Sequence, residues 1–176
     1  MAINKNEILN YSFDNFLREE YTDKILEIRR VTKVVKGGKK FSFRAVVATG
    51  DLKEKIGVGI GRSEDTNVAI EKGIINARKN IIFVPITEQK SISSFVNINS
   101  GSSHIMLKPA KLGTGIKAGS SIRSILELSG IKNIVAKRFG SNNLLNNAKL
   151  TLSALKSLAI KKNLYKKKVF NKNNIF

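Results

Sequence analysis

The chain lacks cysteine and tryptophan and has one histidine and two prolines among its 176 residues. Without cysteine, neither a disulfide nor a thiolate metal site can form. The single imidazole, His104, lies in the Ser-Gly-rich segment GSSHIM, which favours a surface or packing role over catalysis. No apolar run approaches the roughly 18 to 20 residues of a membrane span. The N-terminal sequence MAINKNEILNYSF matches neither a secretory signal nor a transit peptide.

Acidic residues are also scarce, and Glu127 is the only one after Glu88. The chain has 32 Lys and Arg against 13 Asp and Glu, a net charge of +19. A second half with one carboxylate offers almost no general acid–base chemistry. The excess of positive charge predicts a polyanionic partner, either nucleic acid or, less often, an anionic membrane surface. The hydrophobic content of 41% predicts packed cores rather than a disordered basic tail.

The sequence RRVTKVVKGGKKFSFRAVV predicts a β-hairpin with strands at residues 26–35 and 41–49. The Gly37-Gly38 pair between them suits a tight turn, because glycine adopts positive φ angles without strain. The hairpin tip then carries a cluster of lysines: Lys36, Lys39 and Lys40. Because like charges repel, the cluster is best explained by a polyanion lying against the tip.

A third strand is predicted at residues 55–62, followed by a helix with Ser63 or Asp65 as its N-cap. Apolar residues of the helix recur at helical spacing, namely Ile70, Ile74, Ala77 and Ile81. They are expected to cover the face of the second strand that carries Phe41, Phe43, Ala45 and Val47. The glycines of KIGVGIGRS share one face of the third strand, which either packs closely on the helix or contacts RNA.

The second half predicts a further α+β unit after a short extended segment at 83–86 and a polar linker at 87–94. A hairpin at 95–99 and 104–108 precedes a glycine-rich loop at 109–121. A helix ended by Gly130, a strand at 134–139 and a second helix at 144–159 complete this unit. We therefore predict an α+β fold of two small domains, a β-β-β-α domain and an α+β sandwich-like domain. The domain boundaries are an N-terminal extension 1–22, domains 23–88 and 95–160, and a basic tail 161–176.

The loop GTGIKAGSS is the one motif that suggests an enzyme. It lightly resembles the phosphate loop of small-molecule kinases that phosphorylate galactose, homoserine or mevalonate, since a helix N-terminus after a glycine loop binds phosphate. Such a kinase needs carboxylates for Mg²⁺ and for the acceptor hydroxyl. This half supplies only Glu127, which we expect to face apolar neighbours. We predict no catalytic residue, metal or cofactor, and the same loop geometry also suits an RNA phosphate.

Basic residues that flank the hairpin and the first helix form a pattern expected for contact with a duplex RNA backbone. The first domain has no aromatic pair in a motif of the kind that stacks single-stranded bases. The predicted RNA contacts of the first domain are Arg29, Arg30, Lys33, Lys36, Gly37, Gly38, Lys39, Lys40, Lys55, Arg62, Lys72, Arg78 and Lys79. Those of the second domain are Lys108, Lys117, Arg123, Lys137 and Arg138.

The hairpin sequence, GVGIGRS…AIEKGIINARKN, LKPAKLGTGIKAGSSIRSILELSGIKNIVAKRFGSNN and LNNAKL together resemble protein five of the bacterial-type small ribosomal subunit, most closely the cyanobacterial and plastid branch. Where the family has proline after GS-x-N, this chain has Leu144. The resemblance implies a first domain similar to a double-stranded-RNA-binding domain without its first helix.

The resemblance also implies a location in the small subunit of a ribosome, in a plastid or otherwise in a bacterial cytoplasm. It implies contact with small-subunit rRNA and with small-subunit proteins four and eight near the mRNA entry path, and an influence on decoding accuracy. Residues 32–40 correspond to the family's loop at which changes give spectinomycin resistance, so the hairpin tip is expected to insert into folded rRNA.

Two non-enzymatic alternatives remain at this point. One is a free protein that binds duplex RNA outside the ribosome, and the other is a basic membrane-surface protein. The membrane interpretation is the weaker one, because no lysine-rich helix carries a large opposing apolar face.

Overall fold

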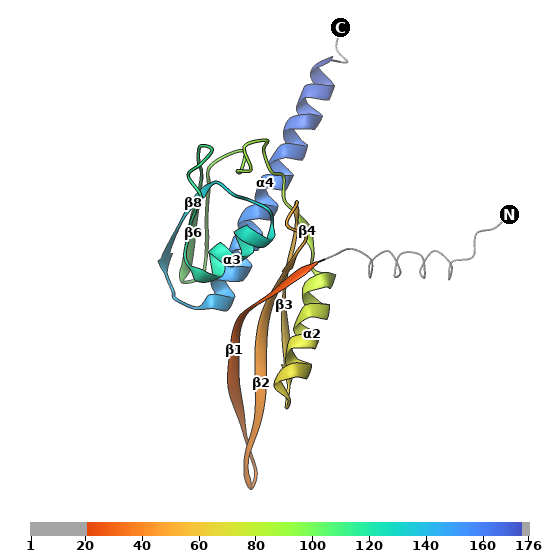
Figure 1. Ribbon diagram of the computed structural model, residues 1–176, viewed down its shortest axis with the longest axis vertical. Helices are drawn as coiled ribbons and strands as arrows, with labels where there is room; N and C mark the ends of the chain where they lie inside the picture. Colours follow the sequence, from red (N-terminus) through yellow and green to blue (C-terminus); the bar gives the residue numbers. More distant parts are fainter. Residues whose placement is uncertain (1–20, 174–176) are drawn as a thin grey trace, which may run out of the picture.

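The structure is a computed structural model that describes residues 21–173, with side chains described for residues 21–160. Of the predicted N-terminal extension, only Tyr21 and Thr22 lie within the described residues, and Thr22 already begins the first strand. The side chains of the predicted basic tail lie outside the described part of the chain. The described residues form two four-stranded sheets with helices packed against them (Figure 1).

The first sheet contains β1 (Thr22–Val35), β2 (Gly38–Gly50), β3 (Lys55–Ser63) and β4 (Ile82–Phe83), antiparallel and in chain order. The helix α2 (Thr66–Lys79) covers one face of this sheet. The predicted β-β-β-α order is confirmed. Asp65 is the N-cap residue of α2, although its side chain makes no capping hydrogen bond.

The glycines of β3 allow α2 to lie directly on the strand. A Cβ atom on Gly61 would stand 1.9 Å from the carbonyl oxygen of Ala69, and one on Gly59 would stand 2.2 Å from the Gly73 oxygen. Close packing on the helix therefore explains these glycines, and no RNA contact is needed to account for them. Beside them, Ala45 and Val47 pack with Ala69 and with half-buried neighbours that include Phe43, Ile70 and Ile74.

The second sheet has the order β5-β6-β8-β7. Its strands are β5 (Val96–Ser100), β6 (Ser103–Pro109), β7 (Ile116–Lys117) and β8 (Ile134–Gly140), and only the β7–β8 pair is parallel. The helices α3 (Ser120–Leu128) and α4 (Leu144–Asn173) pack on one face of it. Gly130, at φ 83°, ends α3, and the N–H of Ile131 donates to the Leu126 oxygen at 3.2 Å.

The helix predicted to end near residue 159 continues to Asn173, so that boundary was wrong. Its sequence contains no Gly or Pro, and it is rich in Leu, Ala and Lys, which have high helix propensity. Leu144 occupies the first helical position. The start is held by Asn143, whose Oδ1 accepts a hydrogen bond from the Leu145 N–H at 3.1 Å.

The two sheets share one apolar core. The face of the first sheet away from α2 contributes Val46, Ala48, Ile56 and Val58 to the same cluster as the buried residues of α3, α4 and the second sheet. The polar segment at 87–94 is also folded, because Ile92 is buried and the Lys90 carbonyl accepts N–H groups of Lys132 and Asn133 at 2.8 and 3.0 Å. Both faces of the first sheet are thus covered near its base, and only its hairpin end is open.

Candidate nucleic-acid interface

The β1–β2 hairpin projects beyond the rest of the first sheet. The last residue of β3, Ser63, pairs with Phe43, so the pairs from Val31–Ser42 to Val35–Gly38 have no third strand beside them. At about 3.4 Å per residue, this two-stranded extension reaches roughly 15–20 Å past the end of β3. Figure 1 shows it as a narrow ribbon that extends past the end of α2 and away from α3 and α4. The shape is that of a probe for a narrow space.

The turn at the tip differs by one residue from the sequence prediction. Val35 pairs with Gly38, so the central residues of the turn are Lys36 and Gly37, and Gly38 begins β2. Gly37 has φ 89°, which is the positive φ that a type II turn requires at its second central residue. A Cβ atom at Gly37 would have no described atom within 4 Å, so the space beside the turn is open there.

Lysines crowd the exposed extension. Lys33 lies directly opposite Lys40, and Lys39 pairs with Val34 next to the turn residue Lys36. All four lysine side chains are exposed. Like charges in directly opposed positions destabilise a sheet, and the sequence has no acidic residue between Glu27 and Asp51 to offset them. The hairpin therefore concentrates positive charge that an external anion would neutralise.

Three arginines lie in one row across the first sheet. Arg44 of β2 pairs with Arg29 on one side and with Arg62 on the other, so their side chains leave the same face. Arg29 Nε lies 2.6 Å from Glu27 Oε1, and Arg62 Nε donates to Ser42 Oγ at 3.0 Å. The Nε of Arg44 is buried without a hydrogen-bond partner among the described residues.

Lys33 and Lys40 continue this face toward the tip, since alternate residues of a strand share a face. We name Arg29, Arg44, Arg62, Lys33 and Lys40 the basic row. Sequence reasoning missed Arg44. Its alternation with Phe43 indicated the face opposite α2, but the cross-strand register that aligns it with Arg29 and Arg62 is visible only in the folded sheet.

Other predicted contacts in the first unit, which consists of the first sheet and α2, lie away from the basic row. Arg30 is on the opposite face, with its guanidinium 5.2 Å from the centre of the Phe41 ring. Arg78 is turned inward, because its Nη2 lies 3.4 Å from Asp23 Oδ2. Lys72 and Lys79 are exposed on α2, and Lys55 is half-buried at the start of β3.

In the second unit, three predicted contacts share the outer face of the sheet. Lys108 and Lys117 both pair with Val135, and Lys137 follows two residues later on the same face. His104 lies on this face too, with its Nε2 against Asn97 Oδ1 and its ring 5.3 Å from that of Phe139. Arg138 points to the other face, toward the start of α4, where its Nη1 donates to Ser141 O at 3.2 Å.

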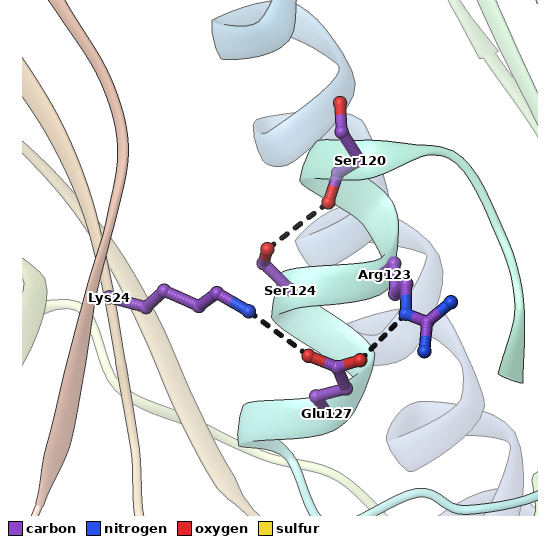
Figure 2. A network of polar contacts seen from close by, with 5 residues as sticks. All are labelled: Lys24, Ser120, Arg123, Ser124 and Glu127. Atoms are coloured by element: carbon purple, nitrogen blue, oxygen red, sulfur yellow. Dashed lines mark hydrogen bonds and ion pairs between the residues drawn. The ribbon is translucent and has the colours of Figure 1, made fainter.

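Arg123 is held by the only acidic residue of the second half. Its Nε donates to Glu127 Oε1 at 2.7 Å, and Lys24 Nζ lies 3.1 Å from Glu127 Oε2 (Figure 2). The expectation that Glu127 faces apolar neighbours was therefore wrong. Hydrogen bonds from Arg123 and Lys24 hold the pKa of Glu127 below its usual range. A carboxylate engaged by two cations is a poor ligand for Mg²⁺, which removes the basis of the kinase interpretation.

Within the described residues, no group of three or more His, Cys, Asp and Glu side chains is placed to hold a metal ion. Over the same part of the chain, no helix is both long and apolar enough to cross a membrane. The fold and its surfaces thus define a two-unit α+β protein with an exposed, strongly basic hairpin.

Two models of known protein families match most of the chain. The family models described as "Ribosomal protein S5, N-terminal domain" and "Ribosomal protein S5, C-terminal domain" match residues 21–85 and 98–168. The chain belongs to the ribosomal protein S5 family. It is a structural ribosomal protein and not an enzyme, as predicted from the sequence.

Individual relatives agree along nearly the whole chain. The small ribosomal subunit protein uS5c of Emiliania huxleyi is 47% identical over 149 residues, which cover 85% of this chain and 93% of the relative. The uS5c of Gracilaria tenuistipitata is 43% identical and covers 93% of this chain and 95% of the relative. The uS5 of Synechococcus strain CC9902 is 43% identical and covers 89% of this chain and 73% of the relative. These relatives confirm the resemblance to the cyanobacterial and plastid branch.

Proposed function

We propose that the chain binds small-subunit rRNA through the projecting hairpin and the basic row, and thereby supports assembly of the small subunit and accurate translation in a plastid ribosome. The observation that carries the proposal is the alignment of Arg29, Arg44 and Arg62 beside the lysines of the hairpin. Glu27 offsets the charge of Arg29, and the other four cations of the basic row are suited to the phosphates of a folded RNA.

The two units contribute different surfaces. The hairpin is long and thin enough to enter between RNA segments, with Lys36, Lys39 and Lys40 at its tip. The outer face of the second sheet adds Lys108, Lys117 and Lys137, and a ring pair, His104 and Phe139, on which a sugar or base can stack. Arg30, Lys55, Lys72, Lys79, Arg123 and Arg138 remain proposed peripheral contacts, whereas the ion pair to Asp23 makes Arg78 a structural residue first.

The position of the protein within the subunit is also part of the proposal. The family resemblance supports a site near the mRNA entry path, beside small-subunit proteins four and eight, where the hairpin reaches folded rRNA. The competing function is binding of duplex RNA outside the ribosome, because that function requires the same kind of basic surface.

Sucrose-gradient sedimentation of an extract separates the two functions. A ribosomal protein sediments with the small subunit and stays with it at moderately high salt, since contacts from both units must break together. Recovery of the chain only in the soluble fractions at low salt would refute the proposal. Binding of the purified chain to a structured small-subunit rRNA fragment should weaken with salt, with a slope of roughly −0.7 to −0.9 per neutralised phosphate.

A further inference from the structure

The helices α3 and α4 begin at the same small cavity. The cavity has a volume of about 60 Å³. Its walls come from the first turn of α3, the end of β8 and the first turn of α4, and include Ser120, Ser121, Arg138, Leu144 and Asn147. Since about 10–15 Å³ of such volume is enough for one water molecule, this space can hold several waters or one phosphate-sized group.

The first backbone N–H groups of α3 have no acceptor within the helix. Its N-cap residue is Gly119, so no side chain caps the helix, and no acidic residue lies in the first turn. The first N–H bonded within the helix is that of Arg123, which donates to the Gly119 oxygen at 2.7 Å. The N–H groups of the three residues before it therefore lack helical acceptors, and the positive end of the helix dipole lies with them. An anion is the natural partner of such a helix end.

The rest of the cavity wall adds positive charge and no negative charge. The Arg138 guanidinium is fixed there by hydrogen bonds from Nη1 to Ser141 O and Asn142 Oδ1. The first turn of α4 is also without an acidic residue. Glu127, the only carboxylate of this half, lies at the far end of α3 (Figure 2).

Asn147 provides an independent indication of a ligand. Its side chain is 1% exposed and lines the cavity, and its Nδ2 donates to Ser141 O at 3.1 Å. That bond fixes the amide orientation and leaves Oδ1 buried without a hydrogen-bond donor. A buried acceptor without a partner is costly. A fully ionised anion has no hydrogen to donate to this oxygen, so Oδ1 calls for a group that carries a hydrogen-bond donor, such as a hydroxyl attached to the anion.

We propose that this cavity binds one phosphate of an RNA strand, with the neighbouring ribose 2′-hydroxyl donating to Asn147 Oδ1. The phosphate accepts hydrogen bonds from the N-terminal N–H groups of α3 and faces Arg138. The 2′-hydroxyl distinguishes RNA from DNA at such a site. The inference rests on the proposed rRNA binding and assigns to it a specific subsite in the second unit, away from the hairpin.

The first test uses the dinucleotide UpU and its 2′-deoxy counterpart dUpdU, titrated into the full chain and followed by amide NMR. Saturable shifts are expected at Ser120, Ser121 and Ile122, with roughly three- to tenfold weaker binding of dUpdU for the loss of one hydrogen bond. Asn147→Leu should bring the two affinities together. If that variant fails to fold, the wild-type ratio decides. Equal wild-type affinities, or no shift at these amides, would overturn the assignment.

The second test uses charge. Ser120→Asp places a carboxylate at the first position of α3, where it favours the helix dipole and repels a phosphate. The melting temperature should stay level or rise while UpU affinity falls by about tenfold. Ser153→Asp, an exposed serine further along α4, makes the same charge change away from the cavity and should leave UpU affinity unchanged. Equal UpU affinities of the two variants would contradict the site.

Binding to the rRNA fragment is measured in the same samples to keep the two proposals apart. If the wild type binds the fragment but shows no UpU site, the cavity assignment fails and the proposed function stands. If the wild type does not bind the fragment, the proposed function fails, and the UpU titration still decides whether the cavity takes a ribose phosphate.

Discussion

Lys24 Nζ lies 3.1 Å from Glu127 Oε2 and thereby connects the edge strand of the first sheet to the end of α3 in the second unit (Figure 2). The contact accompanies a backbone hydrogen bond from Leu52 N–H to the Leu128 oxygen at 3.0 Å. Together with the shared core, these bonds fix the basic hairpin relative to the second sheet. The relative orientation of the two proposed RNA-binding surfaces is thus fixed by the fold.

Glu127→Gln should destabilise the protein modestly, by about 0.5–1 kcal/mol, because the pairs with Lys24 and Arg123 are partly exposed. The pKa of Glu127 is lowered in the folded state, so its contribution is fully present above the unfolded value of 4.5 and is lost as the pH falls through the folded pKa. The difference in unfolding free energy between wild type and variant, measured by urea denaturation, should shrink toward zero in acid. Glu71→Gln, which removes one carboxylate from the exposed side of α2, is the control.

Asp51→Ala should cost about 2–3 kcal/mol of stability. Burial raises the pKa of Asp51, but the backbone N–H groups of Lys55, Lys53 and Glu54 all donate to Oδ1, at 2.8 to 2.9 Å, and the net pKa is lowered. Hydrogen bonds to a charged acceptor are individually worth about 1.5–3 kcal/mol, part of which water restores in an exposed turn. Asp51→Asn keeps one acceptor oxygen, so its unfolding free energy should lie between that of the wild type and that of Asp51→Ala. A variant with unchanged thermal unfolding would show that this turn is not fixed by the carboxylate.

Gly61→Ala should unfold or severely destabilise the first unit, because the new Cβ would meet the Ala69 carbonyl, which is backbone and cannot rotate away. The matched control is Gly101→Asn, at φ 54° with nothing within 4 Å of its Cβ position. Asparagine tolerates that conformation, so the control should melt within a few degrees of wild type. Similar melting temperatures for the two variants, measured by circular dichroism, would refute the close packing of α2 on β3.

Replacing Lys36, Lys39 and Lys40 with Gln should separate stability from function. The lysines are exposed, and Lys40 faces Lys33, so removing three positive charges should leave the melting temperature unchanged or raise it. Binding to the rRNA fragment should weaken, and the salt dependence should become shallower. In ribosomes, the family resemblance predicts altered spectinomycin sensitivity or subunit assembly. Normal assembly, drug response and RNA affinity together would mean that these charges only face solvent.

Much of the fold could be predicted, because local patterns decide it. Alternating residues such as Phe43, Ala45 and Val47 determine which face of β2 meets α2, and Gly130 ends α3 by adopting a left-handed conformation. The end of α4 could not be predicted in this way. Helix propensity continues past residue 160, whereas the apolar pattern that predicts the end of the helix fades there.

The candidate surface was predictable as a set of positive charges but not as an arrangement. Arg29 and Arg62 are 33 positions apart in the sequence and become neighbours of Arg44 only through cross-strand register. Arg78 and Arg123 look the same as other cations in the sequence, yet both are engaged by carboxylates, those of Asp23 and Glu127. Asn147 had no sequence signal, since an unpaired buried amide oxygen depends on what the neighbouring chain supplies.

The core shared by the two sheets also governs when the protein can fold during its synthesis. Val46 and Ala48 are made early, but the residues of α4 that complete their cluster, such as Ala154 and Leu155, leave the ribosome much later. Until then, the first sheet has an uncovered apolar face next to a highly cationic hairpin. The nascent chain must therefore pass through a stage in which it is prone to aggregate and is also attracted to any nearby polyanion. A pause in translation within α4 would prolong that stage.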